Sequence, residues 1–455
     1  MVNSSSQLTR HSRQQTPERQ AARPSAGQQH VDIFDVVVIG GGIGGFTLAK
    51  AMMKADRASN GHRHKQPLRI RLIDPQPAFI FRPYLYETLN GRQPSVDRKP
   101  FFDQWGEACQ YVQGSAEWIE WAPSAETKSI LHTTQGPLPF NVAVLATGAR
   151  PNYYNIEGAR QHTIPLLNPN HMACFQHAID ERLEQLAQIR RKQPYEYLQL
   201  PFYIIGAGPS GVELSFELNT YLHRQIVEHY PQELASLQPD IRLIEAEHNI
   251  LPMASEKEQA IVMQHLLAAG IHVHSNNRVK LVTDTTLITE STHPDTKEVV
   301  ETIWEVDLPP IWLAGIQANI PPRLLPENTE QLPGSDRVCV NDWLEIPGHA
   351  NMYVIGDAAG VTDASGSVVP ASSQATEQMA QYVADDILQY KRRHLPQRRK
   401  GFVFKNKGQV VSLGQHKAML TPELLPKIPG LFDNLTMHGR HIAWLRQTYY
   451  DAKLT

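Results

Sequence analysis

Apolar and polar positions alternate along the chain in blocks that predict strands and helices in turn. Residues 34–40 (FDVVVIG) form an unbroken apolar run ending in glycine, which is typical of a strand buried in a parallel sheet. Residues 41–55 (GGIGGFTLAKAMMKA) predict a helix, and residues 68–74 (LRIRLID) predict a second strand. These segments form one strand–helix–strand unit, interrupted by a polar, basic insertion at residues 56–67.

The same pattern starts again near residue 202. Residues 200–206 (LPFYIIG) predict another buried strand, residues 209–230 a helix, and residues 241–247 (IRLIEAE) the next strand. A later strand signal at residues 351–359 (NMYVIGDAA) leads to a helix over about 370–390 and suits a strand that returns to the first unit. Two such units imply two doubly wound domains in one chain, each able to hold a nucleotide.

We therefore expect an α/β fold with two Rossmann-like dinucleotide-binding domains, the second inserted in the first, plus a C-terminal extension. The first 29 residues are rich in Ser, Gln and Arg with few apolar residues, which is typical of a disordered tail; a transit peptide is the alternative. The expected boundaries are a tail at 1–30, a discontinuous first domain at 31–155 and 325–395, a second domain at 156–324, and a C-terminal segment at 396–455.

Composition narrows the class of protein. The net charge of −3 over 455 residues argues against a nucleic-acid partner, since such binders carry strongly basic surfaces. The three cysteines, Cys109, Cys174 and Cys339, show no CxxC pair and no zinc spacing, so we expect no disulfide scaffold and no metal site. Without an apolar run of roughly 18 to 20 residues, any membrane attachment has to be peripheral.

Glycines with the GxGxxG spacing follow each of the two buried strands. The first set is Gly40, Gly42 and Gly45, and the second is Gly206, Gly208 and Gly211. In this pattern the first glycine permits a tight turn, the second lets a pyrophosphate approach the backbone, and the third allows close helix–strand packing. One such match is weak evidence, but two matches in strand–turn–helix context predict two dinucleotide sites with phosphates at helix N-termini.

The next strand of each unit ends in an acid, Asp74 in the first and Glu245 in the second. Such an acid accepts hydrogen bonds from ribose hydroxyls. Both acids lie further downstream than the roughly 20 residues usual for the motif, because the intervening helix or loop is extended. A carboxylate at Glu245 would repel a 2′-phosphate, which favours NADH over NADPH.

Five elements in order resemble the two-dinucleotide-binding flavoproteins, and within them the type II NADH dehydrogenases (NADH:quinone oxidoreductases). The resemblance covers about residues 32–418. These are DVVVIGGGIGG at 35–45, IFRPYLYETLNG at 80–91, VAVLATGARP at 142–151, IIGAGPSGVELSFEL at 204–218 and MYVIGDAAG at 352–360.

The resemblance implies non-covalent FAD in the first domain and NADH in the second. It places Pro83 in the segment lining the flavin, Thr147 and Gly148 in an ATG element closing the FAD site, and Gly356 and Asp357 where an aspartate binds the ribityl chain. Gly315, in IWLAGI, matches a turn beside the nicotinamide. Hydride transfer between the cofactors needs positioning rather than an acid or base. By resemblance, Glu213 is the positioning residue at the flavin–nicotinamide contact.

Quinone as the electron acceptor is implied by residues 370–387 (PASSQATEQMAQYVADDI), which resemble the family's AQxAxQ element. Gln374 and Gln378 are four residues apart on one helix face, where their amides could hydrogen-bond a quinone carbonyl. The chain departs from the family at Ser373 and Thr376, where alanine is usual, which leaves open which quinone is used.

The C-terminal residues 422–455 mix aromatic and aliphatic residues with Arg, Lys and His, which suits an interfacial helix on a membrane. A basic cluster precedes them and could attract anionic lipids; it comprises Lys391, Arg392, Arg393, Arg398, Arg399 and Lys400. Packing on the second domain, or a homodimer contact, is the alternative. We expect a cytoplasmic protein peripheral to the inner face of the membrane.

Two other functions compete with this hypothesis. A sulfide:quinone oxidoreductase would need two cysteines flanking the flavin, here Cys174 and Cys339, but it has no use for a nicotinamide site. A flavoprotein redox sensor with little turnover could use the 56–67 insertion and the N-terminal tail as binding surfaces. A disulfide reductase is disfavoured because no closely spaced cysteine pair occurs.

Overall fold

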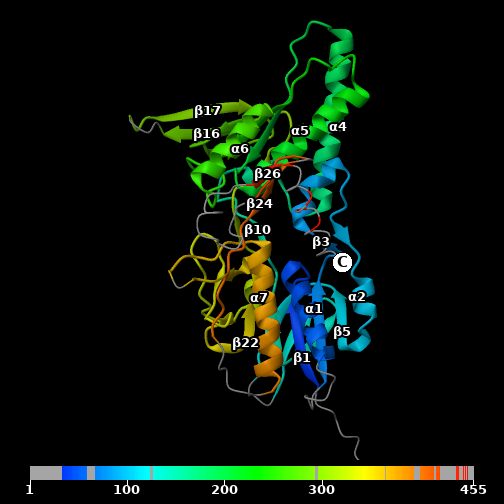
Figure 1. Ribbon diagram of the computed structural model, residues 1–455, viewed down its shortest axis with the longest axis vertical. Coiled ribbons are helices and arrows are strands. Elements are labelled where there is room, and N and C mark those ends of the chain that lie inside the picture. The colour runs from blue at the N-terminus through cyan, green and yellow to red at the C-terminus, as the bar shows by residue number, and fades with distance from the viewer. Residues whose placement is uncertain are drawn as a thin grey trace, which may run out of the picture. The chain divides into compact units, whose positions relative to one another are not determined.

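The computed structural model describes residues 33–58, 67–122, 127–292, 296–363, 365–393, 400–414, 417–420, 437–439, 444, 446 and 448. The expected tail at 1–30 and most of the 56–67 insertion lie outside these residues. The described residues belong to one compact unit built on two main sheets (Figure 1). This architecture confirms the predicted α/β class.

The first main sheet has the strand order β21-β22-β9-β1-β2-β5. All neighbours are parallel except the β21/β22 pair. Its strands are β1 (Phe34–Ile39), β2 (Leu68–Asp74), β5 (Cys109–Gln113), β9 (Val142–Leu145), β21 (Glu345–Ile346) and β22 (His349–Val354). The all-buried pattern of β1 and β9 is that of central parallel strands, as their unbroken apolar runs predicted.

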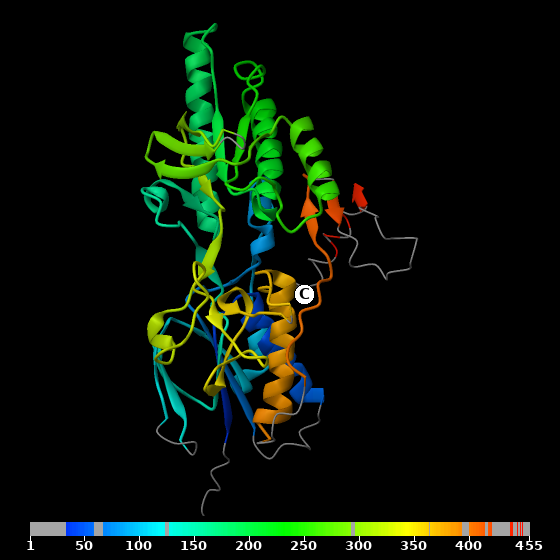
Figure 2. The same ribbon diagram turned by 90° about the vertical axis from the view of Figure 1, so that its left-hand side faces the viewer.

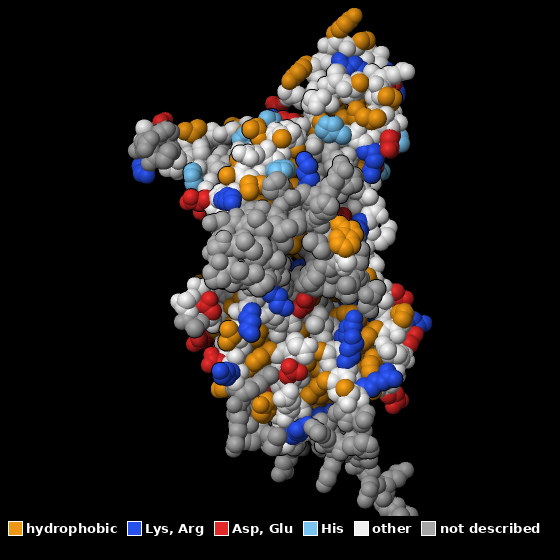
Figure 3. Space-filling view, viewed as in Figure 1, with side chains coloured by type: hydrophobic (Ala, Val, Ile, Leu, Met, Phe, Trp, Pro, Cys, Tyr) orange, Lys and Arg blue, Asp and Glu red, His pale blue; other side chains and the backbone are white. Residues whose placement is uncertain are grey.

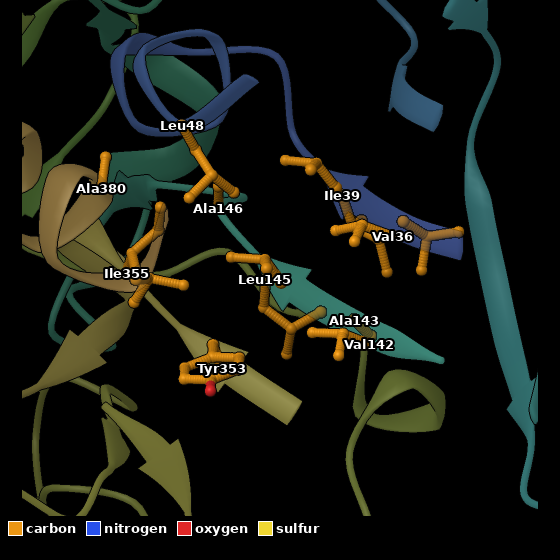
Figure 4. Close-up of a cluster of buried hydrophobic side chains, with 14 of the residues drawn as sticks. Val36, Ile39, Leu48, Val142, Ala143, Leu145, Ala146, Tyr353, Ile355 and Ala380 are labelled. Carbon is orange, nitrogen blue, oxygen red and sulfur yellow. The ribbon is translucent and has the colours of Figure 1, made fainter. Parts of the chain in front are cut away.

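Two helices, α1 (Ile43–Ala58) and α7 (Ser373–Asp386), lie side by side against this sheet (Figures 1 and 2). Figure 4 shows side chains of β1, β9, β22, α1 and α7 gathered in the shared core. The antiparallel sheet of β6 (Ala116–Glu120), β7 (Ser129–Thr133) and β8 (Gly136–Phe140) adds Ile119, Leu131 and Phe140 to the same core. The first main sheet, its helices and the antiparallel sheet thus share one hydrophobic core.

The second main sheet, β11-β18-β12-β13-β14, is parallel throughout. Its strands are β11 (Ile164–Pro165), β12 (Pro201–Ile205), β13 (Asp240–Ile244), β14 (His272–His274) and β18 (Ile311–Trp312). The helices of this part are α3 (Ala159–His162), α4 (Pro169–Lys192), α5 (Pro209–His229) and α6 (Glu256–Ala268), joined by an antiparallel sheet of β15 (Arg278–Val282), β16 (Thr286–Thr292) and β17 (Val299–Glu305). All these strands fall between β9 and β21 in the chain, as the predicted insertion requires; the exact domain boundaries stay a prediction.

Further short elements complete the fold. Paired strands are β3 (Phe79–Ile80) with β4 (Ser95–Val96), β10 (Ala149–Pro151) with β19 (Ile316–Ala318), and β20 (Val338–Cys339) with β23 (Ala359–Gly360). Helical turns are α2 (Lys99–Asp103), η1 (Arg82–Tyr84), η2 (Tyr86–Asn90), η3 (Gly106–Ala108), η4 (Pro322–Leu324), η5 (Gly356–Ala358) and the π-helical η6 (Ile387–Lys391), which continues α7. The β10–β19 pair joins the chain just before the second sheet to the chain just after it.

The expected interfacial helix over 422–455 is wrong for the part of it that the structure describes as a strand. There β26 (Met437–Gly439) pairs with β25 (Ala418–Leu420), and β25 with β24 (Val410–Ser412). The strand ladder uses backbone groups that a helix would bond internally. The other described residues of that segment, 444, 446 and 448, are helical, and Trp444 is exposed.

The basic cluster also differs from expectation at its start. The Lys391 ammonium lies 2.6 Å from the buried carboxylate of Glu345, and the buried Arg392 guanidinium pairs with Asp56. These two cations are therefore neutralised inside the protein and are poorly placed to attract lipid. On the face shown in Figure 3, basic side chains of the described residues are scattered among acidic and apolar ones. No helix of the described residues is long and apolar enough to cross a membrane.

Candidate functional site

The first glycine turn has the geometry of a phosphate cradle. Gly40 adopts φ +105°, and a side chain there would strike the backbone of Ala146, directly after the neighbouring strand β9. A side chain at Gly45 would strike the carbonyl of Gly40, so these two glycines let α1 pack against β1. Gly42, by contrast, faces open space at the N-terminus of α1. A pyrophosphate could approach the backbone at that point.

The second glycine turn repeats this geometry. Gly206 also has φ +105°, and a side chain at Gly211 would strike the carbonyl of Gly206. Gly208 faces open space and stands at the N-cap of α5. The first glycine of each set donates its N–H to the adjacent strand, Gly40 to Ile73 at 2.8 Å and Gly206 to Ile244 at 2.8 Å. The chain therefore carries two equivalent phosphate cradles.

Each strand-end acid is locked onto its own glycine turn. Asp74 Oδ2 accepts from the Gly41 N–H at 2.6 Å, and Glu245 Oε2 accepts from the Ala207 N–H at 2.7 Å. The second oxygen of each acid accepts from the backbone two residues further on, at 2.8 Å from Gln76 and at 2.9 Å from Glu247. These bonds fix both carboxylates beside the cradle, which is where the ribose of a bound dinucleotide has its hydroxyls.

A pocket lies near the carboxyl end of each strand that carries one of these acids. The first, of about 680 Å³, is lined by residues at the carboxyl ends of β2 and β5, including Pro75, Tyr111 and Gly114. The second, of about 470 Å³, is lined by residues that follow β13 and β14, including His248 and Ser275. Clefts at the carboxyl ends of parallel strands are the usual ligand sites of such sheets. Both pockets suit the adenosine end of a dinucleotide.

Polar groups gather where the ATG and GD elements meet the first cradle. The Thr147 hydroxyl is buried next to Gly40 and has no hydrogen-bond partner among the described residues. Burial raises the pKa of Asp357, on η5, while Arg82 and Arg337 act against that shift. The orphaned hydroxyl and the half-buried carboxylate fit the polar ribityl chain of a flavin. The residues present therefore fit FAD.

The glycines and the proline predicted for this region take the positions expected of turns. Gly148 and Gly356 have φ +68° and +72°, and Pro83 is the second residue of η1, directly after Arg82. A side chain at Gly356 would come within 3.1 Å of the Thr376 methyl, which also lies 3.0 Å from the side-chain position at Gly44. Thr376, a departure from the family pattern, thus fills the contact between α7, α1 and η5.

Gly315 lies at the edge of the second cradle. It has φ +84°, and a side chain there would collide with the Tyr154 hydroxyl. Burial raises the pKa of Tyr154, with nearby Glu245 acting in the same direction. Tyr154 therefore lies between the Gly315 turn and the region of Glu245.

Glu213 is buried on α5 and is bound by the C-terminal part of the chain. Its Oε1 accepts from the Ser412 N–H at 2.8 Å and from Arg446 Nη2 at 3.3 Å. Arg446 also bonds Tyr86 at 3.0 Å and pairs with Glu87 at 2.6 Å, both on η2. Burial raises the pKa of Glu213, while Arg446 acts against this shift. Glu213 thus joins α5, η2 and β24.

A second buried carboxylate, Glu217, was missed at the sequence level. Its Oε2 accepts from Asn90 Nδ2 at 2.6 Å, and burial raises its pKa to about 7. One signal could have found it, since Glu217 follows Glu213 by four residues on an otherwise apolar helix face. Two buried arginines, Arg446 and Arg98, were also missed. Their spacing in the sequence gives no signal, because segments distant in the chain bury them.

Gln374 and Gln378 point to the segment at 405–408 rather than to open space. Gln374 bonds the Gly408 carbonyl at 2.9 Å and the Lys407 N–H at 3.0 Å. Gln378 bonds the carbonyl of Lys405 at 2.9 Å and its N–H at 3.0 Å. Both amides thus hold the extended chain against α7. This pairing differs from the expected amide–quinone hydrogen bond.

The cysteines lie apart from this arrangement. Cys174 is exposed on α4, and Cys339 is part of the β20–β23 pair, so the two belong to different parts of the fold. All three cysteines are free, and burial raises the pKa of the Cys109 thiol to about 12. The structure therefore gives no support to a cysteine pair across a flavin. Among the described residues no cluster of three or more His, Cys, Asp or Glu could hold a metal ion.

Two phosphate cradles with locked ribose acids define a two-dinucleotide oxidoreductase. The family model described as pyridine nucleotide-disulphide oxidoreductase matches residues 34–380, and the chain belongs to this family. Within it, the chain is similar to the type II NADH:quinone oxidoreductase of Haemophilus influenzae, with 25% identity over 411 residues that cover 85% of this chain and 86% of the relative. This similarity confirms the predicted resemblance.

Solved structures show the same fold. The structure of NDH2 from Plasmodium falciparum in complex with NADH has a TM-score of 0.72 at 16% identity and covers 93% of this chain and 95% of that one. The sulfide:quinone oxidoreductase from Aquifex aeolicus has a TM-score of 0.68 at 18% identity, over 92% of this chain and 90% of that one. At these sequence identities the two structures establish the fold alone. The reaction has to be inferred from the residues of the site.

Proposed function

We propose that this chain is an FAD-dependent NADH:quinone oxidoreductase that takes hydride from NADH and passes the electrons to a quinone without pumping protons. The observation that carries this proposal is the pair of matched cradles, each with a locked ribose acid. The first cradle lies near Thr147 and Asp357, which suit the ribityl chain of a flavin. The second cradle lies beside the Gly315 turn. The identity to a curated type II NADH:quinone oxidoreductase supports the same activity.

FAD binds at the first cradle and supplies the two-electron chemistry between NADH and the acceptor. The N-terminus of α1, opened by Gly42, holds the phosphates, and Asp74 holds the ribose. Thr147 and Asp357 bind the ribityl chain, while Pro83, Gly148 and Gly356 shape the turns around the flavin. No residue of the chain is covalently attached to the cofactor in this proposal.

NADH binds at the second cradle, where Gly208 opens the N-terminus of α5 to the pyrophosphate and Glu245 binds the adenosine ribose. Since Glu245 is held as a hydrogen-bond acceptor by Ala207, a 2′-phosphate would meet a fixed negative charge. The Gly315 turn, packed against Tyr154, borders the nicotinamide end of this site. Glu213 positions α5 against η2 and so helps to set the distance over which hydride moves.

The quinone docks beside α7 and the 405–408 segment. Gln374 and Gln378 shape this site by holding the segment in place, and they bind a quinone carbonyl only if the segment moves. The cytoplasmic face of a membrane supplies the quinone, and the exposed Trp444 is one apolar contact to it. Co-sedimentation with liposomes tests this attachment, which fails if wild type does not sediment. Equal sedimentation of W444A and wild type would instead exclude Trp444 as a contact. Size-exclusion chromatography tests whether two copies associate.

Anaerobic titration of the purified protein tests the activity. We expect a yellow protein that NADH bleaches stoichiometrically and NADPH bleaches far more slowly, and that added quinone reoxidises with turnover. A colourless protein would refute the flavin. Bleaching without turnover would favour a redox sensor instead, and NADH-independent reduction by sulfide would favour a sulfide:quinone oxidoreductase.

A further inference from the structure

A buried arginine, Arg98, lies against the first glycine turn. Its side chain is only 5% exposed, and Nη1 comes within 2.5 Å of the position that a side chain at Gly41 would take. Aromatic rings surround the guanidinium, with Phe79 at 4.5 Å and Phe46 at 5.2 Å from ring centroid to guanidinium carbon. Arg98 precedes α2, far from the glycine turn in the chain, and the fold brings the two together.

Among the described residues, this cation has aromatic rings around it but no hydrogen-bond acceptor. Arg98 Nε is buried without a hydrogen bond, and within the described chain the guanidinium forms no hydrogen bond or ion pair. The nearby carboxylate of Asp74 is committed to the backbone N–H groups of Gly41 and Gln76. Burial lowers the pKa of Arg98 to about 10, with Asp74 opposing the shift. A buried charge with unused donors is strongly unfavourable unless an anion pairs with it.

We propose that Arg98 binds the pyrophosphate of FAD. The phosphates are the anionic part of this cofactor, whereas the adenine, the ribose and the isoalloxazine are uncharged at neutral pH. The guanidinium fork matches phosphate oxygens in a bidentate manner. Arg98 Nη1 lies against Gly41, the residue before the open Gly42 at the α1 N-terminus, so the guanidinium is next to the turn at which those oxygens would bind. Arg98 thus adds a side-chain charge to a cradle otherwise made of backbone N–H groups.

The inference deepens the flavin part of the proposed function and is independent of the acceptor. Removing the charge of Arg98 should have two separate effects, one on the stability of the apoprotein and one on the affinity for FAD. Without FAD, replacing Arg98 with an apolar residue relieves an unpaired buried cation, so the apoprotein should be at least as stable. With FAD, the same change removes a charged hydrogen bond, so cofactor affinity should fall.

The test follows FAD binding to apoprotein by quenching of flavin fluorescence, which reports the first cradle alone. We expect R98M to bind FAD at least about tenfold more weakly than wild type, and R98K to recover part of the loss. The matched control is R71M, because Arg71 is another half-buried arginine of the same sheet whose donors bond the carbonyls of Ile70 and Glu107. R71M should bind FAD as wild type does.

Displacement of bound FAD identifies the contacted group. ADP should displace FAD from R98M at least about tenfold less well than from wild type, whereas adenosine should compete equally with both. Equal FAD affinity in R98M and wild type would overturn the inference, and so would equal losses for ADP and adenosine or a lowered melting temperature of R98M apoprotein. Failure of wild type to bind FAD would instead refute the proposed function.

Discussion

At the scale of single residues, the glycines of the two cradles divide into two kinds. Gly40, Gly45, Gly206 and Gly211 are required by the backbone itself, because a side chain at each would strike a neighbouring carbonyl or chain. Gly42 and Gly208 face open space, so the fold tolerates a methyl group there and only a ligand would feel it. Substitution at the second kind therefore separates binding from folding.

We expect G208A to raise the KM for NADH about tenfold while the FAD content and the melting temperature stay near wild type. Its methyl group would occupy the space where the pyrophosphate approaches the α5 N-terminus. Steady-state kinetics and flavin absorption measure both effects. G42A should show the reverse pattern, with FAD loss and an unchanged KM in the loaded enzyme. Loss of stability in G208A, comparable to that of G211A, would contradict the assignment.

Glu217 makes stability depend on pH. Its pKa is raised from the ordinary 4.5 to about 7, so the folded chain retains a proton that the unfolded chain releases. This contribution is fully present below pH 4.5 and is lost as the pH rises through 7. Relative to E217Q, wild type should therefore lose up to roughly 3 kcal/mol of stability across this range.

Urea unfolding of wild type and E217Q at pH 5 and pH 8 measures this difference. E228Q, a change at an exposed glutamate of the same helix, is the matched control and should track wild type at both pH values. Parallel stability profiles for wild type and E217Q would show that Glu217 is ionised in the folded chain at neutral pH.

At the scale of elements, the sequence predicted strands and helices well where one face or both were apolar. β1, β12, α1 and α5 appear where the apolar runs and glycine turns place them. The helix expected over 422–455 is wrong at residues 437–439, because an aromatic and basic mixture suits both a membrane helix and a strand whose pairing partners are elsewhere. Its partner strand β25 lies at residues 418–420, outside the segment that was read as a helix.

The α7 glutamines offer a prediction at this scale. We expect Q374A/Q378A to raise hydrogen exchange at the backbone of Lys405 and Lys407, since each amide loses its bonding partner. The KM for quinone should rise in parallel if the segment shapes the quinone site. Exchange by mass spectrometry and quinone kinetics measure the two effects. Weakened quinone binding with unchanged exchange would favour direct amide–quinone contact instead.

At the scale of the whole molecule, the order of motifs along the chain predicted the two-sheet architecture and both cofactor cradles. The groups that complete the site could not be predicted in the same way. Arg98, Asn90 and Arg446 reach their partners only after distant segments pack together, and none of them belongs to a periodic pattern. Local spacing therefore predicts the phosphate sites, while tertiary packing decides what surrounds them.

The hydrogen bonds and ion pairs between α5 and η2 have a consequence for catalytic turnover. Asn90 and Leu89 are bonded to Glu217 and Arg224 of α5, and Arg446 joins Glu87 of η2 to Glu213. A hinge rotation that separated the two nucleotide-binding domains would break all of these bonds. Hydride transfer should therefore proceed without a large hinge motion, and its single-turnover rate should be unaffected by solvent friction when sucrose thickens the medium. A rate that falls in proportion to viscosity would instead reveal a clamshell motion.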